Sequence, residues 1–347
     1  MRYIGNKENL LDKIYQTMLD RDICGNSFFD FFSGTTNVAR FFKKKNYQIF
    51  SSDLLYFSYV LQKAYIANNQ NLTFENLLQN ISTNSKYLFS SPLEKVVEYL
   101  NQIPDKQGFI YKNYTPAGNR MYYSEENGLR IDAIRQQIEN WKDNELISEN
   151  EYFVLLACLI ETIPFYANVA GIYAAFYKKW DPRAVKKLVL RPIEIVVNNK
   201  GNFVYNIDSV SLIDKIEADI FYLDPPYNQR QYAPNYHLME TIAKYDNPEI
   251  KGVTGLRANY ENEKSKFCNA ATALQELKKI AENGKYKTLI LSYNNEGIMS
   301  ETEILSIFGK IGTIELVEFD YTRFKSNSNG ENTNKKYIKE QLYILRK

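Results

Sequence analysis

One strand–turn–helix–strand segment constrains the fold more than any other part of the sequence. Residues 27–32 predict a short buried strand, Gly34 predicts a turn, and residues 36–45 have the pattern of a helix. Residues 47–52 predict another strand, which ends at Asp53. Strands joined through a helix run parallel in one sheet, because the helix carries the chain back to the starting edge.

Later apolar runs extend this sheet. Residues 220–223 form a continuous apolar run, and residues 288–292 repeat the pattern. A closing strand is expected near residues 337–345. We therefore predict an α/β fold with a Rossmann-like, mostly parallel sheet.

The hydrophobic pattern changes between the two groups of strands. Apolar side chains recur at helical spacing in residues 131–141 and again in residues 152–163, which indicates two amphipathic helices. We therefore predict a mainly helical inserted domain at residues 61–204. Residues 1–60 and 205–347 would form the catalytic domain.

The charge balance and the cysteines limit the class of protein. The 43 Lys and Arg residues nearly cancel the 41 Asp and Glu residues, so any contact with nucleic acid has to come from a local surface. Cys24, Cys158 and Cys268 are odd in number and far apart, as expected for free thiols rather than for disulfides or metal ligands. The sequence contains neither a signal-peptide pattern nor a membrane-length apolar run. We expect a cytoplasmic protein without a membrane span or a bound metal.

The sharpest motif is Asp224-Pro225-Pro226-Tyr227, which ends an apolar run. A carboxylate oxygen of Asp224 and the carbonyl of Pro225 can both accept hydrogen bonds from the exocyclic amine of adenine, which localises the lone pair of that amine. The prolines fix the backbone, and Tyr227 offers an aromatic face to a base extruded from a duplex. These four residues are the candidate catalytic group. The alternative is a rigid turn in which the prolines only end the strand.

A candidate cofactor site follows the first strand. Asp53 lies about twenty residues beyond the glycine turn, where a carboxylate can accept hydrogen bonds from both ribose hydroxyls of an adenosine. Asp208, after another short strand, is a candidate for contact with the adenine. Each of these two acids can instead cap the backbone of the segment that follows it. The candidates in the loop between strand and helix are Asp30, Phe32, Ser33, Gly34, Thr35 and Thr36.

These blocks, in this order, resemble the Dam-like, alpha-group DNA adenine-N6 methyltransferases, a family that includes the FokI and NlaIII modification enzymes. Arg2, Tyr3 and Lys7 lie in a segment similar to the family's N-terminal cofactor motif, and residues 224–227 match its catalytic motif. Residues 291–294 are similar to a later motif that lines the pocket. The resemblance implies the methyltransferase fold, S-adenosylmethionine (SAM) as cofactor and double-stranded DNA as substrate. It also implies that the helical insert recognises the target sequence.

Two positions in the glycine loop depart from the family pattern. The family usually has proline where this chain has Phe31, and a second glycine where it has Thr36. A threonine Cβ narrows the gap between the loop backbone and the methionine part of the cofactor. The contacts of this loop are therefore expected to differ from those of the family.

Residues after the catalytic motif are the first candidates for DNA contacts, because amides suit adenine edges and arginine suits guanine or phosphate. The candidates are Asn228, Arg230, Gln231 and Tyr232 and, in the insert, Arg120, Tyr122 and Lys178. The alternative for the first group is a solvated polar loop. His237, the only histidine, is expected to make a structural or phosphate contact.

Two other functions share much of this pattern. An RNA adenine methyltransferase would have the same fold and cofactor loop, and a catalytically silent DNA-binding regulator would keep the fold. The large insert disfavours the first, and the intact motif at residues 224–227 disfavours the second. For the favoured DNA methyltransferase we expect a monomer. The family's usual task, protection of host DNA, implies a cognate restriction endonuclease encoded nearby.

Overall fold

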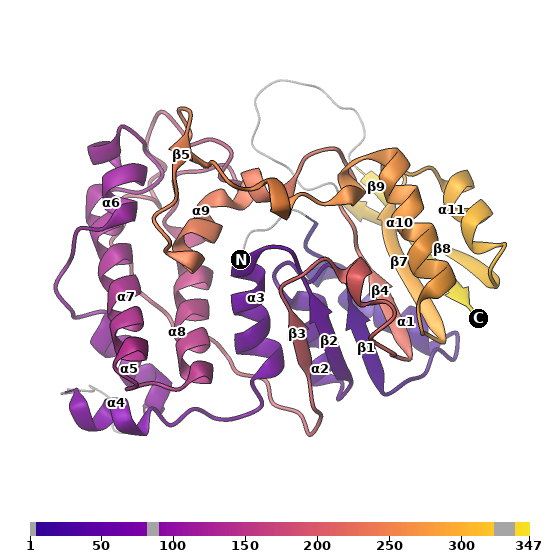
Figure 1. Cartoon of the computed structure of the whole chain (residues 1–347), viewed down its shortest axis with the longest axis horizontal. Coiled ribbons are helices and arrows are strands. Elements are labelled where there is room, and N and C mark those ends of the chain that lie inside the picture. The colour runs from indigo at the N-terminus through magenta and orange to yellow at the C-terminus, as the bar shows by residue number, and fades with distance from the viewer. Residues whose placement is uncertain (1–4, 82–89, 323–336) are drawn as a thin grey trace. The chain divides into compact units, whose positions relative to one another are not determined.

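The computed structural model of the chain describes residues 5–81, 90–322 and 337–347. Within these limits the chain forms two compact units, whose elements are labelled in Figure 1. The sheet unit comprises Ile4–Gln62, Val196–Tyr232 and Glu261–Lys347, and the helical unit comprises Lys63–Ile195 and Ala233–Tyr260.

The sheet unit is built on seven strands: β1 (Ser27–Asp30), β2 (Gln48–Ser52), β3 (Phe203–Tyr205), β4 (Ile220–Leu223), β7 (Thr288–Asn294), β8 (Thr313–Thr322) and β9 (Tyr337–Arg346). They lie in the order β3-β2-β1-β4-β7-β9-β8 (Figure 1). The strands from β3 to β7 in that order run parallel, whereas β9 is antiparallel to both β7 and β8. The predicted α/β fold with a mostly parallel sheet is therefore confirmed.

Helices cover both faces of this sheet: α1 (Leu11–Leu19), α2 (Asn37–Lys44), α3 (Tyr56–Gln62), α10 (Ala270–Asn283) and α11 (Glu301–Phe308). Neighbouring strand residues point to opposite faces. Phe28 of β1 stacks on Phe42 of α2 at a ring-centroid distance of 4.0 Å. Phe29 belongs to a buried cluster on the other face, together with Leu277 of α10 and Ile304 of α11. All of β4 is buried, which explains why its sequence is continuously apolar.

The helical unit contains α4 (Glu75–Asn80), α5 (Pro92–Leu100), α6 (Phe109–Tyr114), α7 (Glu125–Asp143), α8 (Glu149–Thr162), most of α9 (Tyr232–Lys244) and a hairpin of β5 (Ile250–Lys251) and β6 (Leu256–Arg257). The two predicted amphipathic helices are confirmed as parts of α7 and α8. In the described part of the chain, no helix is both long and apolar enough to cross a membrane.

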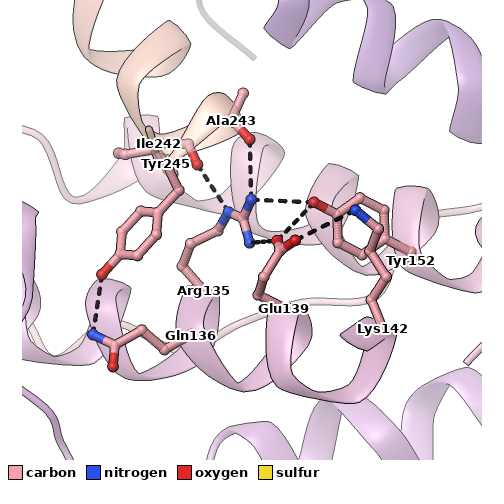
Figure 2. Close-up of polar contacts among 8 residues, drawn as sticks. All are labelled: Arg135, Gln136, Glu139, Lys142, Tyr152, Ile242, Ala243 and Tyr245. Atoms are coloured by element: carbon pink, nitrogen blue, oxygen red, sulfur yellow. Dashed lines mark hydrogen bonds and ion pairs between the residues drawn. The ribbon is translucent and has the colours of Figure 1, made fainter. Parts of the chain in front are cut away.

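The segment from Ala233 to Tyr260 belongs to the helical unit, although the sequence assigns it to the catalytic part of the chain. Arg135 of α7 makes one set of contacts that hold it there (Figure 2). Its Nε donates to the carbonyl of Ile242 at 3.1 Å, and its Nη2 donates to the carbonyl of Ala243 at 3.3 Å. Both carbonyls lie in the last turn of α9, where helix carbonyls lack partners within the helix. A buried guanidinium therefore fastens α9 to α7.

Two further side chains complete what we call the Arg135 cluster, formed by Arg135, Glu139 and Tyr152 (Figure 2). Arg135 Nη1 donates to Glu139 Oε2 at 2.5 Å, and Nη2 donates to the hydroxyl of Tyr152 in α8 at 3.1 Å. That hydroxyl donates in turn to Glu139 Oε2 at 2.9 Å. Each nitrogen of the guanidinium has a partner, so the cluster joins α7, α8 and α9 without a buried donor nitrogen left unpaired.

Candidate active site and nucleic-acid interface

Three parallel strands bring the predicted acidic residues to one edge of the sheet. β1 ends at Asp30, β2 ends immediately before Asp53, and β4 ends immediately before Asp224. β1 lies between β2 and β4 and is parallel to both. The carboxyl ends of neighbouring parallel strands share one edge, which is where ligands bind in open α/β sheets.

Asp30 is a buried carboxylate with an unused acceptor. The residue is 1% exposed. Ser33 Oγ donates to its Oδ2 at 3.4 Å, whereas Oδ1 has no hydrogen-bond partner among the described residues. Burial, together with the negative charges of Asp224 and Asp53, raises the pKa of Asp30 to about 7. A ligand ammonium would give the unpaired oxygen a hydrogen-bond donor. It would also offset the repulsion from Asp224 and Asp53, because it carries the opposite charge.

The predicted glycine loop after β1 has a left-handed backbone at two positions. The φ angle is +49° at Gly34 and +64° at Thr36, and a β-branched residue rarely adopts that conformation. The Thr36 hydroxyl is buried and has no hydrogen-bond partner within the described residues. Thr35 is buried, and the Phe32 ring packs edge-on against Phe267 at 5.0 Å. Thr36 therefore takes the backbone shape that suits the glycine usually found there in the family.

Asp53 and Asp208 both cap backbone N–H groups. Asp53 Oδ2 accepts from the N–H of Gly34 at 2.8 Å, and its Oδ1 accepts from the N–H of Leu55 at 2.9 Å. Burial raises the pKa of Asp53. Asp208 Oδ1 accepts from the N–H of Val210 at 3.1 Å. The capping alternative is present at both positions, and each carboxylate keeps further lone pairs for a ligand hydroxyl or amine.

In the catalytic motif, Asp224 is held through one of its two oxygens. The Tyr227 hydroxyl donates to Asp224 Oδ1 at 2.7 Å, and the Lys7 ammonium lies 3.5 Å from the same oxygen. Burial raises the pKa of Asp224, and the charge of Lys7 and the hydrogen bond from Tyr227 oppose that rise. Among the described residues both of these contacts are made to Oδ1, so Oδ2 is left for a further donor.

The rest of the motif is fixed by packing. Pro225 and Pro226 are buried. The carbonyl of Tyr227 accepts a hydrogen bond from the N–H of Ile298 at 3.0 Å. The Tyr227 ring packs edge-on against Tyr293 with centroids 5.1 Å apart, so the later motif at the end of β7 lies beside the catalytic motif.

Lys7 connects the catalytic motif to a residue that the sequence analysis missed. Its ammonium donates to the hydroxyl of Tyr227 and, at 3.1 Å, to Oε2 of Glu340 on β9. Glu340 is 4% exposed. The sequence did carry a signal, because Glu340 interrupts an alternation of apolar residues in the predicted closing strand.

The remaining residues of the predicted N-terminal motif, Arg2 and Tyr3, lie outside the described residues. Across the part of the chain that the structure describes, no group of three His, Cys, Asp or Glu side chains is arranged to hold a metal ion.

The loop after the catalytic motif exposes two of its four predicted DNA contacts, Asn228 and Arg230. Tyr232 is half-buried. The Gln231 amide is used within the sheet unit: its Nε2 donates to the carbonyl of Ser265 at 3.0 Å, and its Oε1 accepts from the Ser265 N–H at 2.8 Å. Gln231 therefore anchors the loop.

Two residues of the helical unit that were predicted to contact DNA, Arg120 and Tyr122, make contacts within that unit. Arg120 donates to the carbonyls of Val253 and Gly252 at 3.0 and 3.1 Å, so it fastens the tip of the β5–β6 hairpin. Tyr122 is fully buried, and its hydroxyl donates to the carbonyl of Tyr173 at 2.8 Å. The expectation that Tyr122 lies at a DNA-facing surface is corrected, because its ring packs in the core of this unit.

His237 is buried in the helical unit, with Nε2 at 3.0 Å from the carbonyl of Tyr173. Burial lowers the pKa of His237 to about 4, so the ring is neutral at pH 7. Of the two contacts expected for it, the structural one is present.

Lys178 lies in an irregular segment that two buried asparagines fix in place. Asn168 Nδ2 donates to the carbonyl of Tyr177 at 2.9 Å. Asn127 Nδ2 donates to the carbonyl of Lys186, also at 2.9 Å. The backbone of this segment is therefore held by side-chain hydrogen bonds, although it forms no helix or strand.

We call residues 177–191 the basic strap, because this segment exposes Lys178, Lys179, Lys186, Lys187 and Arg191. Tyr177 and Trp180 lie among these cations and are half-buried. The one acidic residue of the strap, Asp181, pairs with Arg183 at 2.5 Å. The strap is thus a local basic surface of the kind that a chain with balanced charge needs in order to bind phosphate.

Comparison with known proteins shows the family of the chain. Residues 3–307 match the family model of the D12 class N6 adenine-specific DNA methyltransferases. The whole chain is 38% identical to the type II methyltransferase M.NlaIII of Neisseria lactamica and covers 99% of it. It is 40% identical to the modification methylase StsI of Streptococcus sanguinis and 41% identical to the type II methyltransferase M.FokI of Planomicrobium okeanokoites. In those two cases 100% of this chain is aligned, but it spans about half of the relative, 52% and 53%.

The match to the family model extends over most of the chain and includes the acidic sheet edge and the catalytic motif. The relatives add high identity over the whole chain. The chain therefore belongs to the D12 class of N6 adenine-specific DNA methyltransferases.

Proposed function

We propose that this chain is a site-specific DNA methyltransferase that transfers the methyl group of SAM to the N6 amine of adenine in a short duplex sequence, after that base leaves the helix. The observation that carries the proposal is the fixed motif from Asp224 to Tyr227 at the carboxyl end of β4, beside the buried Asp30. The relatives are named type II methyltransferases and modification methylases. They support a role as the modification enzyme of a restriction–modification system with a cognate endonuclease.

The sheet edge fits SAM, which supplies an electrophilic methyl group on a good leaving group when it is bound. The unpaired Oδ1 of Asp30 suits the ammonium of the methionine part. Asp53 suits the ribose hydroxyls, and Asp208 suits the adenine. The residues that would line the methionine part are Phe32, Ser33, Gly34, Thr35 and Thr36, and Arg2 and Tyr3 keep the assignment that the family resemblance gives them.

The chain's own contribution to the reaction is to orient the amine of the target base. That amine is a poor nucleophile, because its lone pair is delocalised into the ring. Hydrogen bonds from the amine to Asp224 Oδ2 and to the Pro225 carbonyl would localise the lone pair. Oδ1 of Asp224 is held by Tyr227 and faces Lys7, so the carboxylate is oriented before the base arrives. Tyr227 would offer part of its ring for stacking.

Duplex DNA would bind through two sets of exposed side chains. The basic strap, including Lys178, would neutralise phosphates, and its fixed backbone would limit the entropy lost on binding. Asn228 and Arg230 would contact DNA beside the target base, with Tyr232 next to them. Arg120 and Gln231 would act by fastening the hairpin and the loop to which they are bonded.

We further propose a monomer that works in the cytoplasm. The three cysteines are free, and a reducing compartment would keep them so.

The proposal is tested in a bacterial host that lacks its own DNA methylation. The wild type and the Asp224→Ala variant are expressed there, and methyladenine is mapped in the host DNA at single-base resolution. We expect methyladenine at one short motif with the wild type alone. Identical DNA from the two strains would contradict the proposal. Transfer of labelled methyl from SAM to RNA, but not to duplex DNA, would make RNA the substrate.

A further inference from the structure

The sheet unit contains a buried ion pair that joins residues 333 positions apart in the sequence, Lys7 and Glu340. Their side chains are 3% and 5% exposed. The same ammonium also contacts the Tyr227 hydroxyl, lies 3.5 Å from Asp224 Oδ1 and lies 4.6 Å from the centre of the Tyr227 ring. The Lys7 ammonium therefore interacts with two carboxylates and with the aromatic residue of the catalytic motif.

A purely structural role does not account for this pair. Taking two charges out of water costs several kcal/mol per ion, and well-packed apolar side chains in the same place are often equally stable or more stable. Glu340 stands in a strand whose buried neighbours on the same face, Leu342 and Ile344, are apolar. An apolar residue would continue that face, so the carboxylate is retained at a cost to folding.

The distances suggest what the pair does. Lys7 Nζ is nearer to Glu340 Oε2, at 3.1 Å, than to Asp224 Oδ1, at 3.5 Å. Lys7 contacts Oδ1 of Asp224, whereas the amine of the target base is proposed to bond to Oδ2. Glu340 holds the ammonium slightly farther from Asp224, so Lys7 favours the charged form of that carboxylate without pairing with it as closely as with Glu340.

We propose that Lys7 and Glu340 are positioning residues of the methyl-transfer site: Glu340 holds the Lys7 ammonium where it orients Asp224 and Tyr227 for the target amine. This inference rests on the proposed methyltransferase function. It moves Lys7 from the cofactor, where the family resemblance places it, to the catalytic carboxylate.

The charges around Asp224 make the proposal testable, because the two variants should change the pKa of Asp224 in opposite directions. Lys7 and Tyr227 contact Asp224 and lower its pKa. Asp30 and Glu340 are like charges that interact with it, and the Tyr222 hydroxyl also faces it. Among these groups Lys7 is the cation. Removing the charge of Lys7 should therefore raise the pKa of Asp224, whereas removing the charge of Glu340 should lower it.

The experiment compares Lys7→Met and Glu340→Gln with the wild type in the full-length protein. The pKa of Asp224 is read by 13C NMR of protein labelled at aspartate carboxyls, without cofactor, with Asp224→Asn used to assign the signal. We expect shifts of about one pH unit, upward for Lys7→Met and downward for Glu340→Gln. In the same variants, kcat on duplex DNA at pH 7 should fall about 100-fold for Lys7→Met and about tenfold for Glu340→Gln. The acid limb of the kcat profile should move with the pKa.

Two exposed residues of the same sheet provide matched controls. Lys339 and Glu318 form a surface ion pair at 2.7 Å, with side chains 52% and 36% exposed. Lys339→Met and Glu318→Gln make the same chemical changes and should leave both the Asp224 pKa and the kcat profile unchanged. The double variant Lys7→Met/Glu340→Gln should be no slower than Lys7→Met alone, because Glu340 acts through Lys7.

SAM binding and thermal unfolding separate this proposal from its competitors. We expect SAM affinity within about twofold of the wild type in both variants, since neither is assigned to the cofactor. A loss of SAM affinity as large as the loss of kcat would return Lys7 to the cofactor site. An unchanged Asp224 pKa, or shifts of the same sign in the two variants, would overturn the inference. If the wild type itself transfers no methyl group to DNA, the proposed function fails, while the NMR titration still decides how the charges are coupled.

Discussion

The two units each bury a charged cluster, and the clusters differ in how completely they are paired. In the helical unit, all three nitrogens of the Arg135 guanidinium donate to carbonyls, a carboxylate or a hydroxyl (Figure 2). At the sheet edge, one ammonium, that of Lys7, lies against Glu340 and Asp224, and Oδ1 of the nearby Asp30 is buried with no partner in the described residues.

This difference separates a structural cluster from a functional one. Buried polar groups in proteins are normally paired, so an unpaired acceptor at the end of a strand marks a place that a ligand completes. Each nitrogen of the Arg135 guanidinium is paired within the helical unit, and the cluster holds helices together. The sheet edge carries excess negative charge, which costs stability and would suit a positively charged ligand such as the proposed cofactor.

The largest effect is expected from Asp224→Ala, which removes the carboxylate that we propose to be catalytic. We predict a loss of methyl transfer of about a thousandfold, because both the acceptor for the amine and the anchor of Tyr227 are lost. The thermal midpoint should stay near that of the wild type. Transfer of radiolabelled methyl to duplex DNA measures the rate. If Asp224→Ala unfolds instead of staying folded and inactive, Asp224 is needed for stability as Arg135 is, and the contrast between a structural and a functional cluster is lost.

Arg135→Met should show the opposite behaviour. Removing the guanidinium leaves the carbonyls of Ile242 and Ala243 without their donor, so we predict a loss of about 3 kcal/mol in the free energy of unfolding. Chemical denaturation followed by circular dichroism measures it. Lys142→Met, on the same helix and 49% exposed, is the control and should change stability by less than about 0.5 kcal/mol. An Arg135 variant that is fully stable but inactive would reverse the roles assigned to the two clusters.

Asp30→Asn tests whether the unpaired acceptor costs stability. The pKa of Asp30 in the folded state, about 7, lies above the ordinary value of 3.8. The folded state therefore favours the protonated form of Asp30. The stability that this preference contributes is lost as the pH rises from about 4 through 7. We predict that the variant gains stability over the wild type on going from pH 5 to pH 8, on the order of 2 kcal/mol. Its affinity for SAM should fall at pH 8. A stability difference that does not vary with pH would show that Asp30 is not strained by its charge.

The smallest effect is expected from the exposed charges of the basic strap, which belong to neither cluster. Lys186→Gln/Lys187→Gln should raise KM for duplex DNA about threefold to tenfold at low salt and flatten its dependence on salt concentration. Both kcat and stability should be unchanged. Lys278→Gln, a similarly exposed lysine of α10, serves as the control. Equal effects of strap and control variants would argue against the strap as the DNA surface.

The sequence predicted the features that short segments encode. The apolar run at residues 220–223 predicted β4, because a strand covered on both faces has no polar positions. The glycine turn predicted the loop after β1, and the motif that begins at Asp224 directly follows the strand that the sequence predicted before it. Each of these inferences needed only a few consecutive residues.

Contacts between distant segments escaped prediction for a physical reason. Arg135 fastens α9 through backbone carbonyls, which every residue carries, so no sequence pattern marks its partners. Glu340 meets Lys7 only because β9 lies next to β7. Tyr122 stands next to a basic loop in the sequence, yet its ring is buried, because a single residue at a loop boundary has no periodicity from which its direction can be read.

The place of β9 in the sheet also sets an order in time. Although it is the last described strand to leave the ribosome, β9 lies in the interior of the sheet, between β7 and β8. Until residues 337–346 have been synthesised, β7 has an open edge and β8 has no strand to pair with. The same strand delivers the carboxylate of Glu340 to Lys7. Closure of the sheet and delivery of Glu340 to Lys7 are therefore a single event, and under the proposed function we expect a nascent chain to leave DNA unmethylated until β9 is in place.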